Sequence, residues 1–533
     1  MYSSYSSLQQ SQLAAQGYYD TQSTYLLVYA PGRNTALRAT LADQLHRKFR
    51  LADTLGSALT EGVDGVLLVS EDVECMSTAL MCFAKALQDG ADYAVCNAVF
   101  GFGGATALYQ SRAHLAQNRC ALVSRPLLER CRAAAKDPEN VTELLALAAQ
   151  FCAHPARIPQ ALLHYERDIC AEDAFSATGK RAFLMSHVLD MTGAPIVLVS
   201  AVPVLRSMGY EVVVLGPSDG GALQLFVDAG AAVITRPGIR ATPNLWGLAL
   251  CTDLVLVNTV VMARTVRALS GTAVPVLWWL HDAFAGYPHI AHQIPTQLGE
   301  NVRVYSVGSH AANAMRAVRP EFEIRPLIYG LPDYAAENFV RTDLGYNRGR
   351  PLFATVGSFE RRKGHDIFCK AIRLLPPEVR EKASFLFVGQ AADKEMMDSV
   401  RALTADYPEN VYYCKRLTRD EIKSLMEQCT GLVCASRDDP MPTFVTEGLI
   451  FGKPSIVSEH TGTAGLISEG RNGFVYHNDD PQQLAVLLEH AIEHPEELAS
   501  MRTECRKMYE QYYSKEAFEQ TLRAAVEDLT AKK

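Results

Sequence analysis

The sequence predicts an α/β protein in which two doubly wound, Rossmann-like domains stand in series behind a smaller α/β domain. Short apolar runs alternate with helical patterns along most of the 533 residues, which is typical of parallel sheets covered by helices. A chain of this length exceeds what one hydrophobic core usually serves, so three domains are expected.

The last block, residues 351–531, is predicted to be one of the doubly wound domains. Its strands are expected at 352–356, 384–388, 411–414, 431–435 and 454–457, with helices between them such as 366–375 and 419–428. The middle block, residues 180–331, repeats the alternation, with strands at 182–186, 211–215, 232–235, 254–257, 274–279 and 302–307. Residues 332–350 are polar and strand-poor, as expected of a linker between domains.

Composition excludes several classes of protein. Hydrophobic content of 48%, with 21% charged residues and a net charge of -8, describes a soluble globular protein and argues against a nucleic-acid partner. Asp253 and Asn258 interrupt the most apolar stretch, 245–263, which therefore predicts a short helix and a buried strand rather than a membrane span. We expect a cytoplasmic protein without a transmembrane segment, and leave peripheral membrane association open.

The two remaining compositional features are the N-terminus and the cysteines. Residues 1–23 are rich in Ser, Gln and Tyr and lack a charged start followed by an apolar core, so they predict a flexible tail rather than a signal peptide. The thirteen cysteines contain no CxxC pair and are expected to be buried, reduced thiols rather than disulfides or metal ligands.

Ligands of open parallel sheets bind beyond the carboxyl ends of the strands. The loops expected there contain Gly193 with Thr192, Ala194 and Pro195 after the first strand of the middle block, and His281 with Asp282 after a later one. In the last block the corresponding loops are 357–364 and the segment around Asp439. Two such domains facing each other would place these loops across one cleft.

The most informative segment is SRDDPMPTFVTEGLIFG, residues 436–452. Asp439 and Glu447 lie eight positions apart around a turn that leads into a helix, with Pro440 in the turn and Pro442 expected at the first helical position. The backbone N–H groups of Thr443 and Phe444 would then point off the helix start, which attracts phosphate. The alternative is a solvated acidic loop with a glutamate that interacts with the helix dipole.

Seven motifs in order give the chain a family resemblance over roughly residues 180–531. They are KRAFLMSHVLDMTGAP, WWLHD, YSVGSHAANAM, VGSFERRKGHD, FLFVGQ, DDPMPTFVTEG and EHTGTAGLISEGRNGFVY. Together they resemble the retaining GT-B glycosyltransferases of the family-four class, the glycogen-synthase and sucrose-synthase type. The resemblance implies a sugar donor bound to a nucleoside diphosphate, a glycan or other hydroxyl acceptor, and a product that retains the anomeric configuration.

The resemblance also implies roles for individual residues. Lys363 matches the lysine that contacts the donor diphosphate, and Glu447 the carboxylate that binds the ribose hydroxyls. Asp439 stands where the family has a glutamate that binds sugar hydroxyls and stabilises developing positive charge, and His281 matches the histidine that contacts the donor sugar. The alternatives are a solvated loop cation for Lys363 and a core histidine for His281.

One position in the loop 357–364 departs from the family pattern, and one glycine has an implied role. Ser358 follows Gly357, where the family usually has an arginine. Arg361 or Arg362 could compensate, and Arg362 is the better candidate, although a surface ion pair would explain it equally well. Gly193 would let the backbone approach the β-phosphate and the acceptor without an intervening side chain; otherwise it is a turn glycine.

In this family a lysine, an arginine and helix amides stabilise the leaving diphosphate, so no metal and no cofactor other than the nucleotide-sugar substrate are expected. The departing phosphate is implied to take the acceptor proton late in the reaction.

Residues 24–170 resemble a truncated inverting GT-A glycosyltransferase of family two. The resemblance rests on DGVLLVSEDVE, a helix expected at 76–88, ADYAVCNAVF and CALVSRPLLERC. Asp72 and Glu74 fall where that family has its metal-binding D-x-D, so an active domain would need Mn²⁺ or Mg²⁺. Val141 and Thr142 replace the acidic pair expected before the last helix and leave Glu143 nearby. A degenerate domain for acceptor binding, assembly or support is the favoured interpretation.

The leading hypothesis is therefore a retaining hexosyltransferase-type enzyme of polysaccharide or glycoconjugate biosynthesis. Its rival is a noncatalytic pseudo-glycosyltransferase that binds glycans or acts as a scaffold. A GT-B-shaped epimerase or phosphorylase is a third and narrower alternative.

Overall fold

A computed structural model describes residues 18–32, 34–56, 59, 62–102, 105–110, 119–175, 179–218, 220–239 and 247–531. The chain divides into two compact units, residues 1–256 with 272–274 and residues 257–271 with 275–533. The predicted tail ends earlier than residue 23, because Tyr18–Ser23 form the 3₁₀ helix η1 and the Thr21 hydroxyl lies 3.3 Å from Nδ1 of His46. The rest of that prediction, residues 1–17, lies outside the described residues.

The N-terminal region of the first unit is an α/β layer built on a mixed sheet. Its strands run in the order β2-β1-β3-β7-β5-β6, with β1 parallel to β2 and β3, and with β7 antiparallel to β3 and β5. The bounds are β1 Leu26–Tyr29, β2 Phe49–Ala52, β3 Gly65–Val69, β5 Tyr93–Phe102, β6 Ala105–Gln110 and β7 Cys120–Ser124. Strands β1 and β3 are buried along their whole length, as expected of strands covered on both faces.

Helices of this region lie at α2 Thr35–Leu41, α3 Ala79–Gln88, α4 Arg125–Ala134 and α5 Val141–Phe151. Helix α3 begins three residues later than the prediction of 76–88, because the chain first forms the short strand β4 (Glu74–Cys75), which pairs with β8 (Pro155–Asp168). Local capping fixes the start of α5, where the Asn140 side chain accepts a hydrogen bond from the N–H of Glu143.

The same unit contains the first half of the middle block. Strands β9 (Lys180–Met185), β10 (Tyr210–Gly216) and β11 (Ala232–Thr235) are parallel, and α7 (Gly193–Ser207) follows β9. Strand β6 pairs antiparallel with β11, with Ile234 opposite Tyr109. One sheet therefore runs without interruption from the N-terminal region into the middle block.

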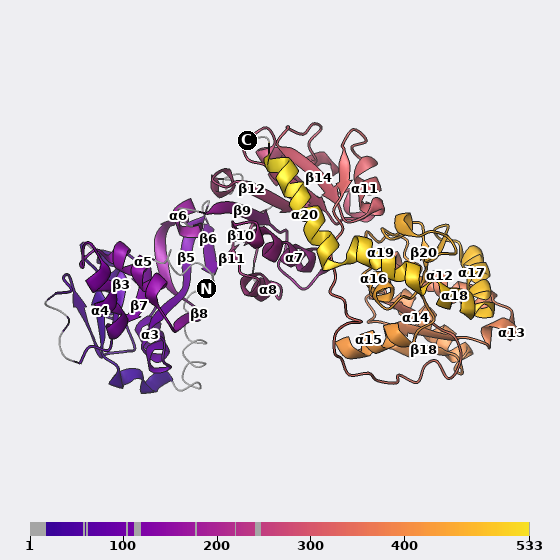
Figure 1. The fold of residues 1–533 in the computed structure, drawn as a ribbon, viewed down its shortest axis with the longest axis horizontal. Helices are drawn as coiled ribbons and strands as arrows, with labels where there is room; N and C mark the ends of the chain where they lie inside the picture. The colour runs from indigo at the N-terminus through magenta and orange to yellow at the C-terminus, as the bar shows by residue number, and fades with distance from the viewer. Residues whose placement is uncertain are drawn as a thin grey trace. The chain divides into compact units, whose positions relative to one another are not determined.

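The second unit begins within β12 (Leu254–Asn258) and contains the parallel strands β13 (Val276–Leu280), β14 (Val302–Ser306) and β15 (Ile324–Pro326). The strand predicted at 274–279 is thus shifted towards its carboxyl end. Helix α20 (Lys515–Thr530) lies beside β14 of this sheet (Figure 1). It packs there through the Phe518 ring, which stacks on Trp279 with 5.6 Å between centroids.

The C-terminal sheet has six parallel strands in the order β18-β17-β16-β19-β20-β21. Their bounds are β16 Leu352–Val356, β17 Ser384–Val388, β18 Val411–Cys414, β19 Gly431–Cys434, β20 Ser455–Ser458 and β21 Gly473–Tyr476. Numbered along this block, the order is 3-2-1-4-5-6, the doubly wound arrangement that the sequence predicted. Strand order reverses between β16 and β19, which is where such sheets bind ligands.

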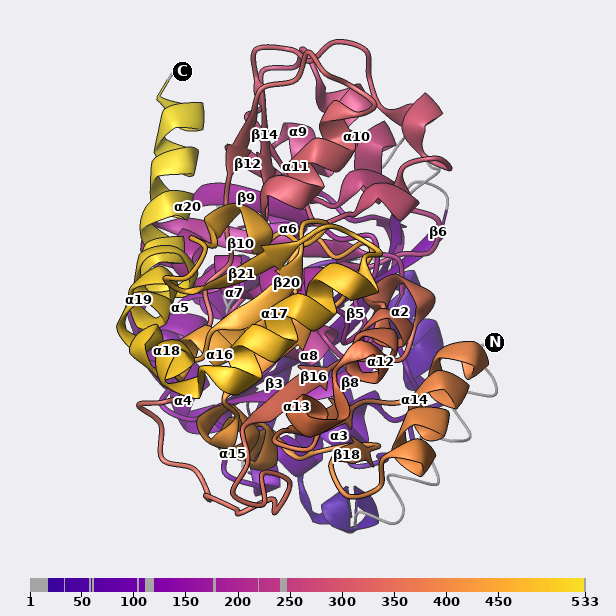
Figure 2. The same ribbon diagram turned by 90° about the vertical axis from the view of Figure 1, so that its right-hand side faces the viewer.

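Helices cover both faces of this sheet. Helix α12 (His365–Leu374) contacts α14 (Lys394–Asp406) and α17 (Pro481–Glu493), and Figure 2 shows α17 lying across the sheet. Helix α16 (Thr443–Ile450) contacts α15 (Arg419–Gln428) and α19 (Arg502–Met508). These crossovers bring the loops after β16 and β19 together at one edge.

Two further predictions concern the chain as a whole. All thirteen cysteines are free thiols, but only nine are buried as predicted; Cys152, Cys170 and Cys414 are partly exposed and Cys251 is exposed. Within the described ranges no helix has the length and apolar character that crossing a membrane would require. The apolar stretch predicted as a helix and a strand forms α9 (Gly247–Leu250) and β12.

Candidate active site at the switch point of the C-terminal sheet

The loops after β16 and β19 are in direct contact. Gly364 has a φ of +65°, and a Cβ added there would lie 1.8 Å from the carbonyl oxygen of Ala435. The N–H of Arg437 donates to the carbonyl of Arg362 over 2.7 Å. Glycine is required at 364 both for its left-handed backbone and for this close approach.

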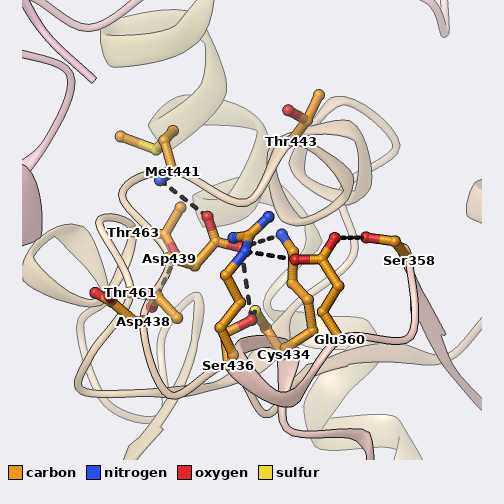
Figure 3. A network of polar contacts seen from close by, with 12 residues as sticks. Ser358, Glu360, Cys434, Ser436, Asp438, Asp439, Met441, Thr443, Thr461 and Thr463 are labelled. Atoms are coloured by element: carbon orange, nitrogen blue, oxygen red, sulfur yellow. Dashed lines mark hydrogen bonds and ion pairs between the residues drawn. The ribbon is translucent and has the colours of Figure 1, made fainter. Parts of the chain in front are cut away.

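This contact brings Lys363 and Asp439 together. The Lys363 Nζ lies 2.5 Å from Oδ2 of Asp439, and the two side chains are 19% and 4% exposed. The other oxygen, Oδ1, accepts a hydrogen bond from the N–H of Met441 over 3.2 Å, so Asp439 also shapes the turn before α16 (Figure 3). The partly exposed Lys363 ammonium is thus paired with a buried carboxylate at the edge of the sheet.

Helix α16 starts at Thr443, directly after this turn. Pro442, which the sequence predicted at the first helical position, is instead the N-cap, so the helix begins one residue later than predicted. The N–H groups of Thr443 and Phe444 have no carbonyl one turn earlier within the helix to bond. The Thr443 hydroxyl lies 3.2 Å from the hydroxyl of the buried Tyr329, which fixes the side chain at the helix start.

Glu447, the second predicted carboxylate, lies on the next turn of α16. Its side chain is 9% exposed, and its Oε1 accepts a hydrogen bond from Nη1 of Arg419 over 2.6 Å. Burial raises the pKa of Glu447 above its usual value, and the Arg419 charge partly offsets that rise. The Arg419 guanidinium also lies over the Tyr334 ring, 4.2 Å from its centroid. Sequence reasoning missed Arg419, which no motif marks.

Arg437 is a second residue that the motif analysis missed. Its guanidinium makes a bidentate pair with Asp366, with both distances 2.8 Å, and donates to the carbonyl of Arg361 over 2.8 Å. It also pairs with Asp479. Arg437 lies in the loop after β19, and Arg361 lies in the loop after β16. These hydrogen bonds therefore hold the two loops at a fixed separation. The sequence signal that could have indicated Arg437 was its position directly before Asp438 and Asp439.

The loop after β16 also contains Ser358, which departs from the family pattern, and Arg362, the candidate to compensate for it. The Ser358 hydroxyl donates to Oε1 of Glu360, and Nε of Arg362 donates to Oε2 of the same carboxylate over 2.8 Å. Burial acts to raise the pKa of Glu360, but the hydrogen bond from Ser358 and the charge of Arg362 outweigh it and lower that pKa. Arg362 therefore forms the surface ion pair that was one of its two interpretations.

His281 follows β13, as predicted. It is half-buried, and its ring lies 4.7 Å from that of Trp279. The next residue, Asp282, accepts a hydrogen bond from the N–H of Val260 over 2.6 Å, and burial raises the pKa of Asp282 to about 6. Beside it, Thr259 has a φ of +71°, a strained conformation for a β-branched residue. Strain and a perturbed carboxyl are both common at functional sites.

Gly193 is the first residue of α7 in the other unit. A Cβ added there would meet no described atom within 4 Å, and its φ lies outside the left-handed region. Neither packing nor backbone conformation within the described part of the chain therefore requires glycine at this position. The expectation that Gly193 lets the backbone approach the β-phosphate and the acceptor stays a prediction.

The carboxylates of the N-terminal region are engaged with the protein itself. Asp72 accepts hydrogen bonds from the N–H groups of Ala36 and Leu37 at 3.1 and 3.0 Å, at the start of α2. Glu74 pairs with His164 at 2.6 Å. Glu143 accepts from the N–H of Lys136 over 2.8 Å. Across the described residues, no group of three or more His, Cys, Asp or Glu side chains is arranged to hold a metal ion.

Two Rossmann-like regions in series, with a lysine, two carboxylates and a helix start at the switch point of the second, define a GT-B-like α/β fold. A family model described as Glycosyl-transferase family 4 matches residues 178–318. A second, described as Glycosyl transferases group 1, matches residues 337–508.

Similarity to individual proteins agrees with these matches. The chain is 25% identical over 194 residues to an uncharacterized glycosyltransferase of Methanocaldococcus jannaschii. It is 26% identical over 160 residues to spore coat protein SA of Bacillus subtilis. These segments cover 36% and 28% of this chain, and they span only 53% and 41% of the two relatives.

Among solved structures, the chain is similar to Anabaena HepE. The HepE complex with UDP matches with a TM-score of 0.54 at 18% identity, over 66% of this chain and 100% of HepE. The complex with UDP-glucose gives 0.52 at 15% identity, over 65% and 99%. This likeness shows the GT-B-like fold, and the family matches support a nucleotide-sugar glycosyltransferase.

Proposed function

We propose that the protein transfers a sugar from a nucleoside-diphosphate sugar to a glycan or other hydroxyl acceptor, with retention of anomeric configuration. The observation that carries the proposal is the meeting of Lys363 and Asp439 beside the start of α16, at the point where strand order reverses. The family matches and the UDP complexes of HepE favour a nucleotide sugar as the donor. We further propose a cytoplasmic role in polysaccharide or glycoconjugate synthesis.

Lys363 and α16 would hold the donor diphosphate. A lysine ammonium is a mobile point charge that suits a phosphate, and the N–H groups of Thr443 and Phe444 add donors at the positive end of the helix. Glu447 would accept hydrogen bonds from the ribose hydroxyls. These groups stabilise negative charge on the leaving diphosphate without a metal, which is the basis for proposing metal independence at this site.

Asp439 and His281 would act at the donor sugar. The Asp439 carboxylate would bind sugar hydroxyls and stabilise positive charge as it develops at the anomeric carbon. His281 would contact the sugar from the loop after β13. The departing phosphate oxygen would take the acceptor proton late in the step, which leaves the new bond on the face from which the diphosphate departs.

We propose a supporting or acceptor-binding role for residues 24–170. Strand β6 extends the sheet of the middle block through β11. Asp72 and Glu74, which a family-two enzyme would use for metal, are bonded to the start of α2 and to His164. This arrangement favours support over separate catalysis by this region.

A screen for nucleotide release tests the proposal. UDP-, GDP-, ADP- and dTDP-sugars are offered with and without chelator, and the active donor is repeated with Glu447→Ala and Lys363→Ala. Release that survives both substitutions would refute the site. Loss of release with chelator would redirect attention to Asp72 and Glu74.

The second candidate is a noncatalytic pseudo-glycosyltransferase. Two observations favour it. Asp439 is one methylene shorter than the family's glutamate, and its charge is already neutralised by Lys363. Absence of release with every donor, in the presence of varied acceptors, together with glycan binding, would support it. The product's anomeric configuration, read by NMR, tests retention separately.

A further inference from the structure

Asp438, next to Asp439, makes a different set of contacts from its neighbour. Its Oδ1 accepts hydrogen bonds from the N–H of Phe284 over 3.1 Å and from Nε2 of His310 over 2.7 Å. Its Oδ2 accepts from the N–H of Ala285 over 2.9 Å. In Figure 3 its carboxylate points away from the cluster around Asp439.

These partners belong to the loop that carries His281. Phe284 and Ala285 form the 3₁₀ helix η5 (Phe284–Gly286), three residues after His281, and Asp438 caps its first N–H groups from 153 or more residues away in sequence. A carboxylate at a helix start bonds donors that would otherwise lack a partner. The position of η5, and hence of the His281 loop, therefore depends on Asp438.

Helix α11 (Ser309–Arg316) supplies the third partner and closes the contact. His310 is 4% exposed, and its ring lies 5.1 Å from Phe284 and 5.5 Å from His460. A Cβ added at Gly308 would lie 2.8 Å from Cε of Met441. The start of α11 thus packs directly on the turn that contains Asp439.

The Asp438 carboxylate stays ionised in this setting. Burial acts to raise its pKa, but the hydrogen bonds from His310 and from the two backbone N–H groups outweigh burial and hold the pKa below its usual range. Three donors share two oxygens, so both oxygens must be acceptors. An amide has only one acceptor oxygen, and its NH₂ group would face a donor.

We propose that Asp438 is a positioning residue that sets the His281 loop against the Lys363–Asp439 pair, while touching neither donor nor acceptor. This inference rests on the proposed function and deepens it. Because Lys363, Thr443 and Glu447 all belong to the C-terminal block, loss of Asp438 leaves nucleotide binding intact. The loss of Asp438 lowers turnover, because His281 is no longer held in the correct position relative to Asp439.

The test compares Asp438→Asn with Asp398→Asn, an exposed carboxylate on α14 that lies outside the site. For Asp438→Asn we expect kcat to fall at least tenfold, with the Kd of the tightest of UDP, GDP, ADP and dTDP, measured by calorimetry, changing less than twofold. Asp398→Asn leaves both unchanged. Equal losses in kcat and nucleotide affinity, or no loss in either, would overturn the inference.

His310 provides a rescue experiment. His310→Gln keeps a donor nitrogen near the place of Nε2 and should retain most of the turnover, whereas His310→Met should resemble Asp438→Asn. The double variant His310→Met/Asp438→Asn should lose no more than either single variant, because both remove the same link. Additive losses would contradict the shared role.

Amide hydrogen exchange separates this inference from the proposed function. Asp438→Asn should accelerate exchange in residues 284–286 while α16 keeps its protection, whether or not any donor is turned over. Unchanged exchange at 284–286 would overturn the inference even in an active enzyme. Accelerated exchange in a protein that uses no donor would sink the proposed function and leave the structural link standing.

Discussion

The N-terminal region and the C-terminal sheet both have carboxylates just beyond a parallel strand, but these carboxylates have different kinds of partner. Asp72 bonds the backbone N–H groups that open α2. Asp439 and Glu447 bond the side chains of Lys363 and Arg419. A strand end with acidic residues is therefore not enough to identify a site; the mobility of the partner matters as well.

The physical difference is whether a ligand could replace the partner. Backbone N–H groups at a helix start cannot move without opening the helix, so a ligand could not replace these partners of Asp72. Lys363 and Arg419 are 19% and 49% exposed and end flexible side chains. A phosphate or ribose could share these cations at little cost in buried, unpaired charge.

The largest expected effect comes from Lys363→Ala. We expect kcat/KM for the donor to fall about 100- to 1,000-fold, since a charged contact to the leaving diphosphate is lost. Lys382→Ala, an exposed lysine on the same domain, is the control. Because Lys363→Ala strands the buried Asp439, the double variant with Asp439→Asn should recover thermal stability without recovering turnover. If the double variant recovered turnover, Lys363 would not be the group that stabilises the leaving diphosphate.

The second effect concerns Glu447. Glu447→Gln keeps an acceptor but loses the charge, and we expect the KM of the donor to rise about tenfold with a smaller change in kcat, as for lost ground-state binding. Arg419→Ala should raise KM less, because Arg419 acts through Glu447. Steady-state kinetics with the active donor measure both variants, and an Arg419→Ala effect larger than that of Glu447→Gln would mean that the arginine contacts the donor itself.

The third prediction uses the pKa of Asp282, which burial raises from 3.8 to about 6. The folded state then binds a proton more readily than the unfolded state, so this group's contribution to stability is present below pH 4 and is lost as the pH rises through 6. Asp282→Asn removes the dependence. Relative to the variant, the wild type should lose about 2 kcal/mol of unfolding free energy between pH 4 and 7, measured by urea denaturation. Parallel pH profiles would contradict the assignment.

The smallest effect is expected at Asp72. Asp72→Ala removes the acceptor for the start of α2 and should cost about 1 kcal/mol of stability, measured as a shift in the denaturation midpoint. Asp72→Asn, which keeps one acceptor oxygen, should cost less. Neither should change kcat/KM at the C-terminal site. A loss of turnover with Asp72→Asn would show that the N-terminal carboxylate has a chemical role.

Local sequence was sufficient to predict most elements of the C-terminal block. The strands predicted at 352–356, 384–388 and 411–414 have those bounds, and so does the helix predicted at 419–428. Apolar runs bounded by turn residues carry this information within a few positions. The start of α3 was less predictable, because β4 exists only through its pairing with the distant β8.

The sequence by itself determined the doubly wound blocks and the loops that would carry chemistry, since these follow from periodicity and turn residues. The candidates Lys363, Asp439 and Glu447 came from these loops together with the family resemblance of their motifs. Only the tertiary structure decided their partners: Lys363 with Asp439, Arg419 with Glu447, and Asp438 with His310, 128 residues apart. Strand order brings such pairs together. That order follows from how helices and strands pack across the whole sheet, which no short stretch of sequence specifies.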